Sequence, residues 1–391
     1  MRKVAILGAT MTKFGKLTQG LDELLLEPSL AAIESSKLSE KDLDLLYISN
    51  MLGGELTKQV SLGTMLADEL GVKIGADRIE NGPAAGASAI KDAFIAIKSG
   101  LFDLVLVAGA EKMTHMATEV ISEYISYMLH PVERMSGATL PSLGAMLARL
   151  YMKQYSVTSE DLAMVAVKNH KNALNNPYAH LQKMVTVDNL LHSNEMEKIN
   201  PMVADPLRRF DISPISDGGA AVVLAELEIA KKYTDLPVTI EGFGQATDSL
   251  ALHERSAPTD INAVKEASKQ AFKMSGISPD QIDVAELHDA FTILELVESE
   301  DAGFFEKGTA HKMVREGQTE IGGKLPINTS GGLKARGHPL GATGLSQVVE
   351  LVWQLRGEAR GRQVPSATYG FSVNLGGFGS NAVSLILKRG D

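Results

Sequence analysis

Two histidines lie in loops whose composition suits acid–base chemistry. His288 belongs to the segment 286–291, and His338 belongs to the glycine-rich segment 331–344. An imidazole donates a hydrogen bond or carries a proton near neutral pH, so both residues are candidates for proton transfer. A proline follows His338 and a helix is expected directly after the segment, so we predict a rigid loop there. For the first loop a plainer interpretation stays open, in which Asp289 caps the next helix.

Two further loops have glycines at positions where backbone groups are accessible. Gly376 and Gly377, in the segment 374–379, form a turn whose N–H groups suit an oxyanion or a carbonyl oxygen. A tight turn between two strands explains them equally well. The segment 80–86 is also rich in small residues, which allow close backbone approach. Because Pro83 fits the first turn of a helix, spacing alone favours a plain strand-to-helix turn there.

Composition excludes several kinds of chemistry. The chain has 391 residues, a net charge of −10 and no cysteine, which excludes disulfides, thiolate metal sites, iron–sulfur clusters and cysteine nucleophiles. The acidic balance argues against nucleic acid as a partner. Uncharged runs such as 136–148 are shorter than the ~20 residues that span a bilayer, so we expect a cytoplasmic protein without membrane contact. Lys334 and Arg336 either face a phosphate-bearing ligand or are solvated.

The elements that must position these loops alternate between strands and helices. Short apolar runs at 3–7, 45–48 and 104–107 are typical of buried strands, and 88–98 has apolar residues at helical spacing. This alternation predicts an α/β protein. The four loops follow or precede such strands, where open α/β sheets place their sites.

A weak internal repeat divides the chain into two halves. A Ser-led helix start recurs at 39–44 and 278–283, and a Gly-Gly turn precedes an apolar strand at 216–219 and 374–377. The first half is longer by about the length of 114–205, which we interpret as a largely helical insertion. We therefore predict two domains: 1–235, which includes the inserted loop domain at about 114–205, and 236–391.

Five segments together resemble the thiolase superfamily, in the branch of archaeal and sterol-carrier-protein-type thiolases. They are 108–113, 176–180, 213–218, 288–291 and 337–339. The resemblance covers nearly the whole chain. It implies the thiolase fold, with two duplicated α/β halves in five layers and an inserted loop domain. It also implies a coenzyme A thioester as substrate or ligand in place of a cofactor, a homodimer or tetramer, and a small zinc-ribbon/OB-fold partner protein.

The chain departs from this family at the nucleophile. The family's acyl-accepting cysteine aligns with Pro83, which has neither a thiol nor a backbone N–H. In the family that N–H and one matching Gly376 hold the thioester oxygen, and loss of one such donor typically costs ~10²–10³ in rate. The positions of the family's basic cysteine hold Ala290 and Asn374. His288 and His338 match the residues that polarise the thioester oxygen.

These observations leave three functions open. The first is an enzyme that makes or breaks a C–C bond of an acyl-CoA without a covalent intermediate, for example by a retro-aldol step that uses His288 and His338. The second is an inactive subunit that binds an acyl-CoA or serves as a scaffold. The third is acetyl-CoA C-acyltransferase (thiolase) activity, which Pro83 disfavours.

Overall fold

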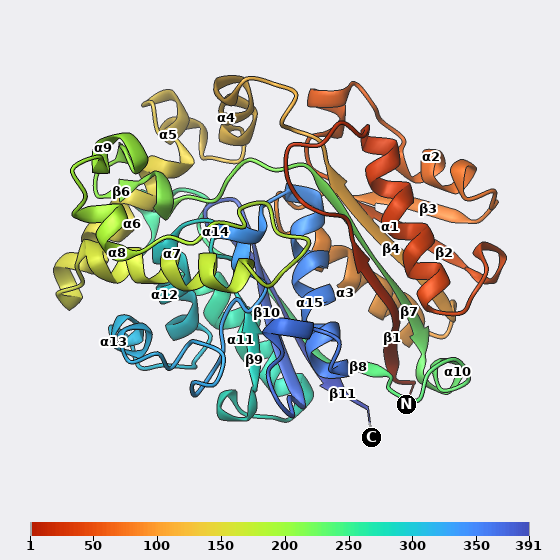
Figure 1. Cartoon of the computed structure of the whole chain (residues 1–391). Coiled ribbons are helices and arrows are strands. Elements are labelled where there is room, and N and C mark those ends of the chain that lie inside the picture. Colours follow the sequence, from red (N-terminus) through yellow and green to blue (C-terminus); the bar gives the residue numbers. More distant parts are fainter. Residues whose placement is uncertain (1, 391) are drawn as a thin grey trace.

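One mixed β-sheet runs through the whole molecule. The computed structural model describes residues 2–390, within which nine strands pair in the order β3-β2-β4-β7-β1-β8-β11-β10-β9 (Figure 1). These strands are β1 (Val4–Met11), β2 (Leu45–Ser49), β3 (Gly75–Ile79), β4 (Leu104–Glu111), β7 (Gly218–Glu226), β8 (Val238–Thr247), β9 (Val284–Glu286), β10 (Tyr369–Gly376) and β11 (Asn381–Arg389). Strands β5 (Met202–Ala204) and β6 (Leu207–Arg208) form a separate pair. The three strands expected from sequence are present as β1, β2 and β4.

The two halves of the sheet have the same topology, which confirms the duplication. In the first half the order β2-β4-β7-β1 combines a parallel β2–β4 pair with antiparallel β4–β7 and β7–β1 pairs. The second half repeats this as β9-β10-β11-β8. The halves meet where β1 pairs with β8. Before β2 and β9 the same turn recurs, in which the backbone N–H of Ser39 donates to Asp42 and that of Ser278 to Gln281.

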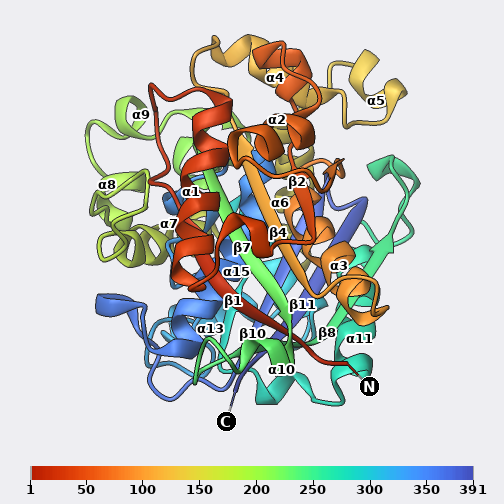
Figure 2. The ribbon, with the colours of Figure 1, turned by 90° about the vertical axis from the view of Figure 1, so that its right-hand side faces the viewer.

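Helices form three layers around the two halves of the sheet. The helices of the repeated halves are α1 (Leu21–Ser35), α2 (Leu62–Glu69), α3 (Ala85–Lys98), α10 (Leu227–Ala230), α11 (Asn262–Ser275), α12 (Thr292–Asp301), α13 (Ala310–Arg315), α14 (Gly332–Arg336) and α15 (Thr343–Arg356). Figure 2 looks onto α1 and α2, with the strands of the first half behind them. Helices α3 and α15 pack against each other between the halves, and α11 and α12 cover the outer side of the second half. The result is the expected five layers.

Side chains that point to opposite faces of a strand belong to different apolar layers of the protein. In β11, Val383 and Leu385 belong to the cluster around α3 and α15, while Ala382 and Ile386 belong to the cluster around α11. Successive side chains of a strand point to opposite faces, so each strand contributes to two apolar layers. The fully apolar strands therefore follow from burial on both faces.

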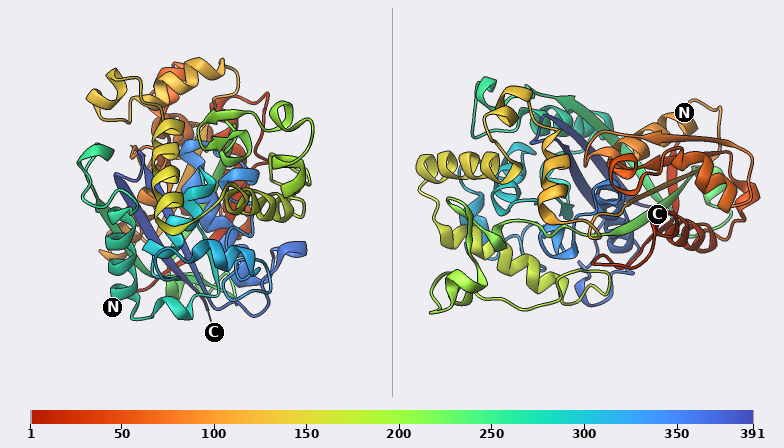
Figure 3. Two further views of the ribbon diagram at one scale, coloured as in Figure 1. Left: turned by 90° about the vertical axis from the view of Figure 1, so that its left-hand side faces the viewer. Right: turned by 90° about the horizontal axis from the view of Figure 1, so that it is seen from above.

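The segment between β4 and β7 is mainly helical. It contains α4 (Thr118–Ser126), α5 (Pro131–Met135), α6 (Leu140–Tyr155), α7 (Ser159–Ala173), α8 (Val187–Leu191) and α9 (Met196–Ile199). Helices α6 and α7 pack on α12 through Leu147, Leu162 and Val297. Seen from above in Figure 3, they lie at the opposite end of the molecule from α1 and α2. Across residues 2–390, no helix combines the length and apolarity that a membrane span requires.

Candidate active site

The two histidines meet at the end of the second half-sheet. His288 follows β9, and His338 lies between α14 and the 3₁₀ turn 340–342 that leads into α15. Their ring centroids are 5.0 Å apart and the rings are nearly perpendicular, at 87°. His288 is 3% exposed and His338 is 9% exposed. The structure thus brings together two rings that are fifty positions apart in sequence.

The hydrogen bond of His288 fixes which of its ring nitrogens carries the hydrogen. Nδ1 lies 3.0 Å from the side-chain nitrogen of Asn374, at the end of β10. An amide nitrogen has only hydrogens to offer, so it donates to Nδ1. The neutral ring then carries its hydrogen on Nε2. The backbone N–H of His288 donates to Glu298 at 2.7 Å, which holds the loop against α12.

The ring of His338 has the opposite arrangement. Its Nδ1 lies 2.7 Å from the hydroxyl of Thr343, and that hydroxyl donates to the carbonyl oxygen of Pro339 at 2.8 Å. A carbonyl only accepts, so the hydroxyl hydrogen points to Pro339 and an oxygen lone pair faces Nδ1. Nδ1 therefore carries the hydrogen and Nε2 presents a lone pair.

Burial keeps both rings neutral. It is the main cause that lowers the pKa of His288 well below its ordinary value, with smaller contributions from His338 and Arg336. Burial, and then the charge of Arg336, lowers the pKa of His338 to about 3. At neutral pH the site therefore offers one N–H donor and one unprotonated nitrogen, and carries no positive charge on either ring.

Buried carboxylates hold the two histidine loops. Glu111, at the end of β4, accepts from the backbone N–H groups of Gly341, Met51 and Leu52, and burial raises its pKa to about 7 in spite of these bonds. Asp289 accepts from the backbone N–H of Leu333 at 2.7 Å and so caps α14, whereas the sequence predicted that it caps the next helix, α12, which has no side-chain cap. The loop of His338 is thus anchored to the first half as well as the second.

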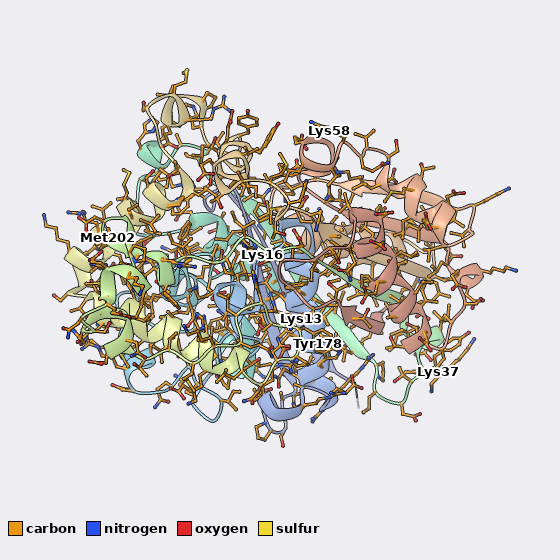
Figure 4. The ribbon with its side chains drawn as sticks, turned by 45° about the horizontal axis from the view of Figure 1, so that its top comes forward. Lys13, Lys16, Lys37, Lys58, Tyr178 and Met202 are labelled. Carbon is orange, nitrogen blue, oxygen red and sulfur yellow. The ribbon has the colours of Figure 1, made fainter. Side chains whose placement is uncertain are left out.

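A second support for His338 comes from the segment just before β7. The backbone N–H of His338 donates to the Ser216 hydroxyl, which also contacts the His180 ring at 2.9 Å. Two residues before His180, the carbonyl oxygen of Tyr178 accepts a hydrogen bond from the backbone N–H of Phe14 at 2.8 Å. Figure 4 shows Tyr178 near Lys13 and Lys16, the exposed lysines on either side of this contact, in the middle of its view.

The loop with Pro83 lies against the turn with Gly376 and Gly377. A Cβ atom placed on Gly82 would lie 3.5 Å from the backbone nitrogen of Gly377 and 3.7 Å from the Cα atom of Gly376. Pro83 itself is buried. Two residues before Gly376, Asn374 reaches the ring of His288. All four loops singled out from the sequence therefore converge.

Two glycines allow this convergence. A Cβ atom on Gly86 would lie 2.8 Å from the backbone nitrogen of Leu345, and one on Gly344 would lie 2.2 Å from Oδ1 of Asn374. A real Cβ atom essentially never comes so close to another heavy atom, so only glycine fits at these two positions. Helices α3 and α15 can therefore begin side by side, with Asn374 between their N-terminal ends.

The structure contradicts the expectation that Lys334 and Arg336 are solvated, and it pairs Arg336 inside the protein rather than leaving it for a ligand. Arg336 is fully buried and pairs with Glu286 at 3.2 Å, and Lys334 is 2% exposed with its ammonium 5.3 Å from the centre of the Phe210 ring. Neither cation is solvated, and the charge of Arg336 is neutralised inside the protein. The sequence offered one signal, since Glu286 stands at the end of an otherwise apolar strand.

Three contributors were not predicted from the sequence. Thr343 and Glu298 each bond a histidine loop, and Asn374 was noted only as a place where a cysteine is absent. Thr343 lies five residues after His338. Outside a helix, such a spacing does not indicate that two side chains are in contact. Only the fold brings β10 beside the end of β9.

Comparison with known proteins assigns the family. Residues 4–228 match the family model "Thiolase, N-terminal domain", and residues 244–389 match "Thiolase C-terminal domain-like". An acetyl-CoA acetyltransferase of Methanothermobacter thermautotrophicus is 44% identical, with all of both chains covered. Sterol carrier protein 2 of Bos taurus is 32% identical over 98% of this chain and 72% of its own. The chain therefore belongs to the thiolase superfamily, in the branch of sterol carrier protein 2 and related archaeal proteins.

A solved structure with the same fold carries a different activity in its name. The Ltp2-ChsH2(DUF35) aldolase superimposes with a TM-score of 0.84 at 28% identity, covering 99% of this chain and 97% of that chain. The present chain is accordingly a thiolase-like, acyl-CoA-related protein whose fold is shared by acyltransferases and by an aldolase. Its lack of any cysteine distinguishes it from cysteine-dependent thiolases.

Proposed function

We propose that this protein cleaves the Cα–Cβ bond of a β-hydroxyacyl-CoA thioester in a retro-aldol step that forms no acyl-enzyme. The observation that carries the proposal is the pair of neutral histidines, one with its hydrogen on Nε2 and the other with its hydrogen on Nδ1, in a chain that has no cysteine to act as a nucleophile. A retro-aldol step requires a base for the hydroxyl and a donor for the developing enolate, and it requires no thiol.

In this step His338 takes up a proton and later returns it, while His288 donates a hydrogen bond. Nε2 of His338 takes the proton of the β-hydroxyl, the Cα–Cβ bond breaks, and its electrons move into the thioester as an enolate. The N–H of His288 donates to the enolate oxygen, where negative charge develops. The proton on His338 then passes to the α-carbon. The products are a carbonyl compound and a shortened acyl-CoA, and neither water nor an oxidant is consumed.

The aldolase named above supports a lyase in this fold, since it carries that activity in its name at 28% identity. The same name pairs Ltp2 with ChsH2(DUF35), and we propose that this chain likewise works with a small partner protein, as well as in a homodimer or tetramer. Coenzyme A enters as part of the substrate in this proposal and no further cofactor is required.

A non-catalytic acyl-CoA-binding or scaffold subunit is the second candidate. The burial of both rings favours it, because His288 and His338 are at most 9% exposed. The third candidate is the acetyl-CoA acetyltransferase activity named in relatives such as the one at 44% identity. That activity requires a nucleophile, and the chain has no cysteine to supply it.

The test is to incubate the protein with β-hydroxyacyl-CoA and β-ketoacyl-CoA esters, with and without free coenzyme A, and to separate the products by chromatography. The proposal expects cleavage of β-hydroxyacyl esters that does not depend on free coenzyme A. Cleavage of β-keto esters only when free coenzyme A is present would establish thiolysis and overturn the proposal. Tight binding without turnover of any ester would establish the binding subunit.

A further inference from the structure

The division of roles between the two histidines requires an explanation, because a neutral imidazole places its hydrogen on either nitrogen. The partner of one ring nitrogen decides where the hydrogen lies on the other. Within residues 2–390 no hydrogen bond occupies Nε2 of either His288 or His338, whereas each Nδ1 has a single buried partner. These partners, Asn374 and Thr343, therefore control what each Nε2 offers to a ligand.

The position of Asn374 orients its amide. Its Oδ1 atom has no hydrogen-bond partner and lies against Gly344, at the N-terminal ends of α3 and α15. Both helices have fourteen residues, and a helix N-terminus carries partial positive charge, which favours the amide oxygen there. The amide nitrogen is then left to face the ring of His288.

Thr343 is equally constrained. It is fully buried as the first residue of α15, and its hydroxyl hydrogen is committed to the carbonyl oxygen of Pro339. The hydroxyl can therefore only accept from Nδ1 of His338. A valine of the same shape would offer that nitrogen nothing, whereas a serine would keep the hydroxyl.

We infer that Asn374 and Thr343 are positioning residues that select β-hydroxyacyl over β-ketoacyl thioesters by fixing opposite hydrogens on His288 and His338. The inference rests on the proposed function and names the residues that set its substrate class. A β-hydroxy ester presents the thioester oxygen as an acceptor and, unlike a β-keto ester, a hydroxyl that can donate. These match the N–H of His288 and the lone pair of His338.

A β-keto ester presents two acceptors and matches only one ring. Its keto oxygen would face the lone pair of His338 in a buried site, where an unsatisfied polar group is costly. We expect the intact β-keto ester to bind about ten- to a hundredfold more weakly than the β-hydroxy ester of the same chain length. Thr343→Val should reduce this ratio toward one, because the hydrogen of His338 is then free to move to Nε2.

The first measurement is made on the resting protein. ¹⁵N spectra of histidine-labelled protein distinguish the two neutral forms of each ring, and His288→Gln and His338→Gln assign the signals. We expect His288 to carry its hydrogen on Nε2 and His338 on Nδ1. The same form on both rings would overturn the inference whether or not the protein has any activity.

The second measurement compares binding of 3-hydroxybutanoyl-CoA and acetoacetyl-CoA by brief equilibrium dialysis in the cold, with chromatography to confirm that each ligand is intact. The wild-type protein and Thr343→Ser should retain the preference, and Thr343→Val should lose it. Equal ratios in the serine and valine variants, or a wild-type preference for the keto ester, would overturn the inference. A third outcome would separate this inference from the proposed function. If His288 and His338 carry their hydrogens on different nitrogens and the protein prefers the β-hydroxy ester but cleaves no ester, only the proposed function is refuted.

Discussion

The burial of His338 predicts a pH dependence of stability that can be isolated by one substitution. Its pKa falls from an ordinary value of 6.5 to about 3, with burial as the first cause and the charge of Arg336 as the second. Below pH 6.5 the ring takes up a proton in the unfolded chain but stays neutral in the folded protein. Its contribution to stability is therefore complete above pH 6.5 and is lost as the pH falls toward 3.

The size of the effect follows from these two values. One pKa unit corresponds to about 1.4 kcal/mol, so the ring destabilises the folded protein by about 2 kcal/mol between pH 7 and pH 5. The His338→Gln variant has no such group. Its free energy of unfolding should fall less over this interval than that of the wild-type protein, by about 2 kcal/mol.

The assay is urea unfolding followed by the fluorescence of the single tryptophan, Trp353, which lies on α15 and is in contact with Tyr178. His192→Gln serves as the matched control, because its ring is already exposed in the folded protein. That variant should follow the wild-type pH dependence. If His338→Gln and His192→Gln behave alike, the pKa of His338 is not lowered and its assignment as an unprotonated buried base is wrong.

Three further predictions concern the elements around the rings. Gly344→Ala places a Cβ atom 2.2 Å from Oδ1 of Asn374, so it should cost about 1–3 kcal/mol in urea unfolding and slow cleavage at least tenfold; wild-type kinetics would show that the contact is unimportant. Arg336→Met leaves Glu286 buried without its partner and should lower the free energy of unfolding in urea by about 3–5 kcal/mol. An unchanged unfolding midpoint would count against a buried ion pair. Pro83→Cys restores a thiol without the second cysteine that acts as base in the family, so thiolysis of acetoacetyl-CoA, followed by absorbance, should stay at background; sustained turnover would contradict this.

Much of the fold was accessible from the sequence because it depends on local patterns. Apolar runs predicted β1, β2 and β4, and a Ser-led turn repeated before β2 and β9 indicated the duplication. Boundaries were less accurate where packing overrides pattern. The sequence predicted a strand over 3–7, but β1 continues past Gly8 to Met11. Gly8 does not end the strand; it is a glycine because α1 packs closely there, and a Cβ atom would lie 2.1 Å from the carbonyl oxygen of Ala32.

The site was only partly predictable, since its chemistry depends on contacts between distant segments. The two histidines were chosen from their loops, whereas Asp289 was expected to cap the next helix and instead caps α14. The hydrogen-bond partners Asn374 and Thr343 carry no local signal, because β10 and the start of α15 reach the rings only in the folded chain. For the pairing of Arg336 the sequence offered only the carboxylate of Glu286 at the end of an apolar strand, and the contact itself forms only in the folded chain.

The most direct test of the central claim is mass spectrometry of a reaction run in D₂O without free coenzyme A. In the proposed step the proton returned to the α-carbon comes from an exchangeable site, so the shortened acyl-CoA should contain at least one deuterium. The protein, returned to H₂O before its mass is measured, should carry no acyl group. Failure to form this product without free coenzyme A, or a protein mass increased by an acyl group, would contradict the account.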